Sequence, residues 1–285
     1  MDQNVITRIE DLMSRLTKVQ QLIAISIIQD PLAASFHSIN ELAVKVGVSP
    51  ASIVRFSQKI TDGGYPQLQS ELQSYIQDIS NPIKRLELNV ITNSEDDIML
   101  TQIYETQLNN LRNTFNQNLI SSVKHAVDVL IGAERIYTSG SRGSYSAAYY
   151  LGHHLNRVLG NADIVPDGDR LADFTLKTTN RDVAVFFCLP RYSERLLRVV
   201  KILQAIGTKI ITINGSPRSP FVEHSDVSFY AFHKSSDFHN SLLSAMLIAE
   251  MLISSVISKN MDSSLNNLAR MEQLFQTLQQ FNEHN

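Results

Sequence analysis

Small hydroxyl side chains and glycines cluster in the stretch IYTSGSRGSYSAAYYL, residues 136–151. A β-type pattern ends here and a helical pattern begins at once. Serine hydroxyls beside the free N–H groups of a helix N-terminus can bind a phosphate. The same glycines also suit a tight strand-to-helix turn that binds nothing, and both interpretations stay open. Because neither GxGxxG nor GK[ST] is present, we expect no dinucleotide or P-loop nucleotide site.

A second group of candidate residues lies in SINELAVKVGVSPASIVRFSQKI, residues 38–60. Ser38 and Glu41 form a capping-box pattern that opens a short helix, which Gly47 is expected to end. Ser49 then opens a second helix. Two short helices around a glycine-containing turn are typical of a helix-turn-helix, whose second helix reads DNA. A plain helical hairpin without DNA is the alternative.

The second of these helices would present its outer face to DNA. An arginine there can reach guanine bidentately, short hydroxyls can bond phosphates or base edges, and lysines can meet phosphates. Residues 45–59 carry three cations and no acid, although the whole chain of 285 residues has a formal net charge of −3. The predicted DNA contacts are Lys45, Ser49, Ala51, Ser52, Arg55, Lys59 and Tyr65.

The elements that must position these residues differ along the chain. Residues 1–80 show helical patterns, whereas β-type runs alternate with helical ones beyond residue 133. This predicts an all-α N-terminal helix-turn-helix domain and a C-terminal α/β three-layer domain with a mostly parallel five-stranded sheet. The β-type runs are 135–139, 162–166, 182–188, 209–214 and 226–232.

Ligands of open parallel sheets bind at the carboxyl ends of the strands. The segment 189–195, which follows the third β-type run, should therefore face the same crevice as the Ser-rich turn. Its Arg191 and Ser193 can bind an anion; alternatively, Arg191 and Arg195 are ordinary surface residues. Asp167, after the second run, is either a ligand contact or a solvated loop charge.

Both groups in this order resemble the RpiR family of bacterial transcriptional regulators, which join a helix-turn-helix domain to a sugar isomerase (SIS) domain. The resemblance covers most of the chain. In the first half it rests on Gly47-Val48-Ser49, Ile53-Val54-Arg55-Phe56 and Gly64-Tyr65. In the second half it rests on IYTSGSRGSYSAAYYLGHHLNRVLG and GTKIITINGSPRSPFVEHSD. It implies regulation of a sugar or amino-sugar catabolic operon, with a phosphosugar as effector.

The resemblance also implies where the effector binds. It places Ser141 and Ser144 in the phosphate-binding loop, and Arg142 stands where glycine is usual. The second loop normally reads Ser-x-Ser-Gly-x-Thr, whereas residues 188–193 keep a hydroxyl only at Ser193. A different anion such as a carboxylate, or a pocket that no longer binds, are therefore alternatives. The candidate effector residues are Ser139, Ser141, Arg142, Ser144, Arg191 and Ser193.

The expected organisation is a helix-turn-helix domain (1–80), a linker (81–105), a SIS-like domain (106–260) and a C-terminal amphipathic helix (261–285). We expect a homodimer or homotetramer, assembled through the α/β domains and the apolar helices near the C-terminus. Its two recognition helices would read an inverted repeat in operator DNA. A phosphosugar isomerase and a ligand-independent DNA-binding regulator are the alternative functions.

Several classes of site and location are not expected. One cysteine, Cys188, excludes an internal disulfide framework, and together with the missing secretory signal it suits the cytoplasm. The apolar run 242–257 carries Glu250 and is expected to be a buried helix rather than a membrane span. We expect no metal, cofactor or catalytic residue.

Overall fold

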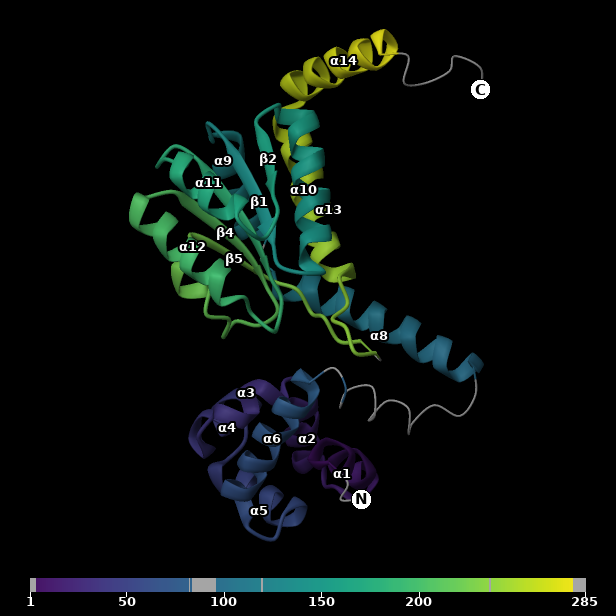
Figure 1. The fold of residues 1–285 in the computed structure, drawn as a ribbon. Coiled ribbons are helices and arrows are strands. Elements are labelled where there is room, and N and C mark those ends of the chain that lie inside the picture. Colours follow the sequence, from purple (N-terminus) through teal and green to yellow (C-terminus); the bar gives the residue numbers. More distant parts are fainter. Residues whose placement is uncertain (1–3, 82, 84–95, 119, 236, 279–285) are drawn as a thin grey trace. The chain divides into compact units, whose positions relative to one another are not determined.

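The computed structural model describes residues 4–81, 83, 96–118, 120–235 and 237–278. The chain forms two compact units, Met1–Thr92 and Asn93–Asn285 (Figure 1). The first contains the helix-turn-helix pattern, and the second contains the Ser-rich turn.

The first unit is helical, as predicted. The predicted capping box is present, with Ser38 and Glu41 each accepting a hydrogen bond from the other's backbone N–H. The predicted stop is also confirmed, because Gly47 adopts a left-handed conformation with φ of 77°. The helices are α1 (Val5–Leu12), a 3₁₀ turn (Met13–Arg15), α2 (Lys18–Gln29), α3 (Pro31–Phe36), α4 (Ile39–Val46), α5 (Pro50–Ile60) and α6 (Gly64–Ser80).

One apolar core holds these helices together. Ile23 of α2, Leu42 of α4 and Phe56 of α5 are almost completely buried in it, and α6 adds Leu68 and Leu72. Each such side chain stabilises the unit by about 1.5–3 kcal/mol on burial. The core therefore fixes which face of α5 points to solvent.

The second unit is a three-layer α/β structure (Figure 1). Its five strands are parallel and lie in the order β2-β1-β3-β4-β5. Helices α9, α10 and α13 pack on one face of the sheet, and α11 and α12 pack on the other. The strands are β1 (Ile136–Gly140), β2 (Ala162–Val165), β3 (Val183–Cys188), β4 (Lys209–Asn214) and β5 (Val227–Tyr230). The helices are α8 (Asp96–Gln117), α9 (Ile120–Ile131), α10 (Ser144–Leu159), α11 (Arg170–Lys177), α12 (Glu194–Ile206), a 3₁₀ turn (Val222–His224), α13 (Leu243–Lys259) and α14 (Met261–Thr277).

All five predicted strands are present, and each end differs from its predicted position by two residues at most. Every residue of β3 is buried, in agreement with an interior strand covered on both faces. Helix α8 begins at Asp96, inside the range expected to be the linker. The rest of that range lies mostly outside the described residues.

The C-terminal helices differ in their burial. One face of helix α13 is buried in the core beside the sheet, in agreement with the buried helix predicted for the apolar run. Helix α14 packs on α10, where the Asn267 side chain donates to the Val158 carbonyl at 3.0 Å. Its Leu265 and Leu274 remain exposed. Among the described residues no single helix could cross a bilayer; α13 and α14 reach the required length and composition only together, with a 103° bend between them.

Candidate nucleic-acid interface and anion site

Helix α5 exposes most of the side chains predicted to contact DNA. Ser49 caps the helix by accepting from the Ser52 N–H at 3.3 Å, and the two serine hydroxyl oxygens lie 2.9 Å apart. Ser49, Ala51 and Arg55 are exposed, while Phe56 on the opposite side is buried. The cap therefore aligns two hydroxyls and a guanidinium along the solvent-facing side of one helix.

The two lysines lie at the edges of this surface. The Lys45 ammonium is 2.9 Å from the Asp30 carboxylate, and the Lys59 ammonium donates to the Arg15 carbonyl at 2.7 Å. Both contacts are exposed, and an exposed ion pair such as that of Lys45 with Asp30 contributes only about 0–1 kcal/mol. Lys45 can therefore leave its partner for a phosphate at little cost.

Tyr65 does not fit its predicted role as a DNA contact. Only 7% of its surface is exposed, and its hydroxyl donates to the His37 carbonyl at 2.8 Å. Burial, with a smaller contribution from the Glu41 carboxylate, raises the pKa of its phenol. A sequence signal for this position was present, since Tyr65, Leu68 and Leu72 share the buried stripe of α6.

The Ser-rich turn joins β1 to α10 at the carboxyl edge of the sheet. Gly140 is required there, because a Cβ at this position would lie 2.8 Å from the Ser144 carbonyl oxygen. Gly143 is not required in the same way. It has helical dihedral angles (φ −58°, ψ −29°), and the nearest atom to an added Cβ is a Leu242 methyl at 4.0 Å. Steric need thus explains one glycine of the turn.

The backbone N–H groups at the start of α10 already have partners within the turn. Those of Ser144, Tyr145 and Ser146 donate to the carbonyls three residues before them, at 3.0–3.2 Å. Ser139 and Ser144 are both buried, and the Ser139 hydroxyl donates to the Val165 carbonyl of β2 at 2.8 Å. An anion at this turn would therefore depend on side-chain donors or on rearrangement of the turn.

A hydrogen bond joins the loop after β1 to the loop after β3. The Arg142 guanidinium donates to the Arg191 carbonyl at 3.0 Å. Both arginines adopt left-handed backbone conformations, with φ of 54° and 67°, which non-glycine residues rarely do. Ser193 caps α12 by accepting from the Leu196 N–H at 3.3 Å. The structure therefore brings the two predicted loops together.

Tyr192 anchors the second of these loops. Burial raises the pKa of its phenol to about 12, and its ring lies 6.0 Å from that of Phe221. The neighbouring Cys188 is 3% exposed, and burial raises the pKa of its thiol well above the usual value. The thiol thus has the environment of a packing residue rather than of a nucleophile.

Asp167 belongs to the same edge of the sheet. The Ser141 hydroxyl donates to the Asp167 carboxylate at 2.6 Å, and the Arg195 guanidinium lies 3.8 Å from its other oxygen. The sequence allowed two interpretations of Asp167, a ligand contact or a solvated loop charge. In the structure its carboxylate accepts a hydrogen bond from Ser141, a predicted effector residue. Three successive loops therefore contribute polar side chains to one place.

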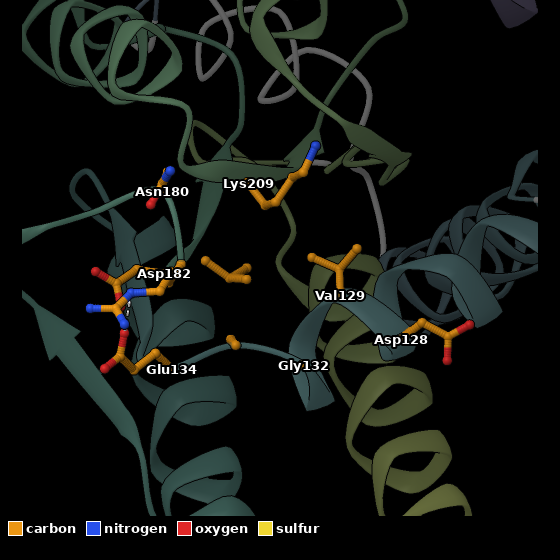
Figure 2. Close-up of a pocket in the computed structure, with 10 residues that line it drawn as sticks. Asp128, Val129, Gly132, Glu134, Asn180, Asp182 and Lys209 are labelled. Carbon is orange, nitrogen blue, oxygen red and sulfur yellow. Dashed lines mark ion pairs between the residues drawn. The ribbon is translucent and has the colours of Figure 1, made fainter.

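A shallow hollow of about 470 Å³ lies elsewhere, at the amino ends of the strands (Figure 2). Lys209 at the start of β4 lines it, as does the exposed Glu134–Arg181 ion pair, whose charged atoms are 2.9 Å apart. Ligands of parallel sheets bind at the carboxyl edge. This hollow therefore lies at the opposite edge of the sheet from the predicted effector residues.

Within the described ranges, no group of three or more His, Cys, Asp or Glu side chains is arranged to hold a metal.

Comparison with known proteins explains why these two units occur in one chain. The model of the rpiR-family helix-turn-helix domain matches residues 3–79, and that of the SIS domain matches residues 129–255. The chain belongs to the RpiR family of transcriptional regulators. A curated family relative, an HTH-type transcriptional regulator of Haemophilus influenzae, is 27% identical, with 78% of each chain covered.

One solved structure supports the fold of both units, and another supports that of the second unit. The NanR protein of Vibrio vulnificus, solved in complex with ManNAc-6P, is 16% identical and has a TM-score of 0.58. That match covers 96% of this chain and 99% of NanR. The sugar isomerase domain of an RpiR transcription factor from Sphaerobacter thermophilus is 19% identical, with a TM-score of 0.59. It covers 61% of this chain and 98% of its own.

Proposed function

We propose that this RpiR-family regulator binds operator DNA of a sugar or amino-sugar catabolic operon and responds to a small anionic metabolite in its SIS domain. The observation that carries the proposal is α5, with Ser49 and Arg55 exposed in a unit that matches the rpiR helix-turn-helix model. A phosphosugar is the first candidate for the effector, because the structurally similar NanR was solved with ManNAc-6P. Such a protein would act in the cytoplasm.

In this proposal Arg55 reads a base and Lys59 neutralises a phosphate. Ser49, Ala51, Ser52 and Lys45 complete the contact surface, and the buried Tyr65 is left out. Arg55→Ala should cost about 1–3 kcal/mol and relax specificity at one base pair. Lys59→Ala removes the same charge, but should weaken all sequences alike and flatten the salt dependence.

The test is selection of DNA from a random library by the purified full chain, followed by affinity measurements at several salt concentrations. An enriched inverted repeat whose discrimination is lost in Arg55→Ala but kept in Lys59→Ala supports the proposal. If no sequence is enriched, the chain is not a sequence-specific regulator. If Arg55→Ala discriminates as the wild type does, α5 is not oriented towards the bases as proposed.

Reading an inverted repeat requires two copies of the chain. The exposed leucines of α14 (Leu265, Leu268 and Leu274) offer apolar surface for a second copy, as the sequence led us to expect. We propose a dimer or tetramer assembled through the unit that contains residues 106–260 and through α14. Sedimentation equilibrium should show the oligomer, and Leu265→Glu with Leu274→Glu should shift it towards the monomer. A monomeric wild type would contradict this assembly.

Effector binding is tested by calorimetric titration with sugar phosphates, ManNAc-6P among them, and with the matching sugar acids. Binding that is lost in Ser141→Ala supports the turn after β1 as the site. An effector can alter operator affinity only by its different affinity for the two DNA-binding arrangements. Titrations should therefore be repeated with operator present.

Two other functions make different predictions. A ligand-independent regulator is favoured by Pro190 and Arg191 in the second loop, and it predicts no response to any anion in the titrations. A phosphosugar isomerase predicts turnover of a sugar phosphate, which chromatography of the incubated sugar would detect.

A further inference from the structure

The pairing of β1 with β2 positions Asp167 at the carboxyl edge of the sheet. Ser139 pairs with Val165 in the sheet, and the Ser139 hydroxyl also donates to the Val165 carbonyl at 2.8 Å. Two residues beyond each of these positions stand Ser141 and Asp167. The sheet therefore sets these two side chains beside each other before any contact between them forms.

The Asp167 carboxylate has the contacts expected of a bound anion. One oxygen accepts from the Ser141 hydroxyl at 2.6 Å, and the other lies 3.8 Å from the Arg195 guanidinium in the first turn of α12. A hydroxyl and a guanidinium are the donors that proteins use for phosphates and carboxylates. They come here from elements that follow β1 and β3.

Solvent and small ligands can reach this group. The Asp167 side chain is 34% exposed and the Arg195 side chain is 63% exposed. Arg142 and Arg191, joined by their hydrogen bond, add positive charge at the same edge. Among the ion pairs of the described residues, Asp167 is the acid that pairs with Arg195, while the neighbouring Glu194 pairs with Arg198.

We infer that the Asp167 carboxylate occupies the place of the effector's anionic group and must be displaced when the effector binds. The inference rests on the proposed function, since it takes the turn after β1 as the effector site. In the closed state Ser141 and Arg195 hold the internal carboxylate. In the bound state they hold the ligand's phosphate or carboxylate, and Asp167 turns to solvent.

The internal carboxylate lowers the apparent affinity of the site for its ligand. The apparent dissociation constant is the intrinsic one divided by the fraction of molecules with Asp167 released. If the closed state is favoured about ten to one, affinity falls about tenfold. Like-charge repulsion between Asp167 and the ligand acts in the same direction. Weakly bound anions would then fail to compete, while a ligand with further contacts to the protein would succeed.

The experiment compares anion binding by the full chain and its variants, with inorganic phosphate and ManNAc-6P as the two probes in calorimetric titrations. Asp167→Asn removes the charge and keeps the size. Asp169→Asn is the matched control, because it removes the same charge two residues away, where the side chain makes no capping hydrogen bond to α11. Asp167→Ser is the second variant, and thermal unfolding of each variant confirms the fold.

We expect Asp167→Asn and Asp167→Ser to bind at least one probe roughly tenfold more tightly than the wild type. The affinity of Asp169→Asn for the probes should remain within about twofold of the wild-type value. Ser141→Ala should abolish binding both in the wild type and in Asp167→Asn. The inference is overturned if the two Asp167 variants bind no more tightly than Asp169→Asn.

The outcomes also separate the inference from the proposed function. Loss of binding in Ser141→Ala without a gain in Asp167→Asn overturns the internal competitor and leaves the effector site standing. If Ser141→Ala does not affect binding, the probe binds elsewhere, and both the internal competitor and the proposed effector site are overturned. If neither Asp167 variant binds either probe, both are overturned as well, because release of the carboxylate should then have revealed the site.

Discussion

Gly140→Ala is the most direct test of how the turn after β1 is built. The added Cβ would lie 2.8 Å from the Ser144 carbonyl oxygen, 2.9 Å from its carbon and 3.1 Å from the Tyr145 nitrogen. All three are backbone atoms at the start of α10, so no side chain can turn away to make room. Forcing the turn apart should cost about 1–3 kcal/mol. A smaller entropic gain of about 0.4–1 kcal/mol, from the stiffer unfolded chain, offsets part of this cost.

Gly143→Ala is the matched control, because Gly143 already has helical dihedral angles and open space around it. It should gain about 0.4–1 kcal/mol through the same entropic effect. The two variants should then differ by about 2 kcal/mol, which corresponds to roughly 4–8 °C in Tm for a unit of this size. Differential scanning calorimetry of the full chain measures the difference. Equal melting temperatures for the two variants would refute the close approach at Gly140.

Three further predictions concern side chains that are buried or partly buried. Tyr65→Phe should cost about 0.5–1.5 kcal/mol in urea unfolding, because it removes the hydrogen bond to His37, yet leave operator affinity unchanged; a large loss of DNA binding would restore Tyr65 as a contact. The Cys188 thiol should react with Ellman's reagent only as fast as the protein unfolds, since it is buried and its pKa is raised; rapid labelling of the native chain would contradict this burial. Partial burial, with Arg157 and His154, lowers the pKa of His153, so the unfolded state binds more protons near pH 6.5 and stability should fall as the pH drops below it. His153→Gln should flatten that decline between about pH 7 and 5 in thermal unfolding, and an unchanged slope would exclude His153 as its source.

The fold was predictable from the sequence because its signals are local. VAVFFC and KIITIN are apolar on both faces, which only interior strands tolerate, and both runs form strands. The capping box at Ser38 and the glycine stop at Gly47 fix the ends of α4 within the same few residues. The order of the strands is different in kind, because it depends on pairings between residues far apart in the chain, which no local pattern encodes.

The candidate site was predictable only in part. The sequence placed the two loops at one edge of the sheet, and the hydrogen bond from Arg142 to the Arg191 carbonyl joins them there. It did not show that Gly140 alone of the two turn glycines is sterically required, or that Tyr65 is buried. Both facts depend on close approaches between elements, and residue type alone does not reveal such distances.

The two left-handed arginines bear on whether the altered loops still form a site. A non-glycine residue in this conformation costs about 1–2 kcal/mol, and such strain persists only where the surrounding structure compensates for it. Here the compensation comes from the site itself, because the Arg142 side chain donates to the carbonyl of the second strained residue, Arg191. The pairing of these two residues, with Asp167 held by Ser141 beside them, supports the proposal of an anion site with altered specificity.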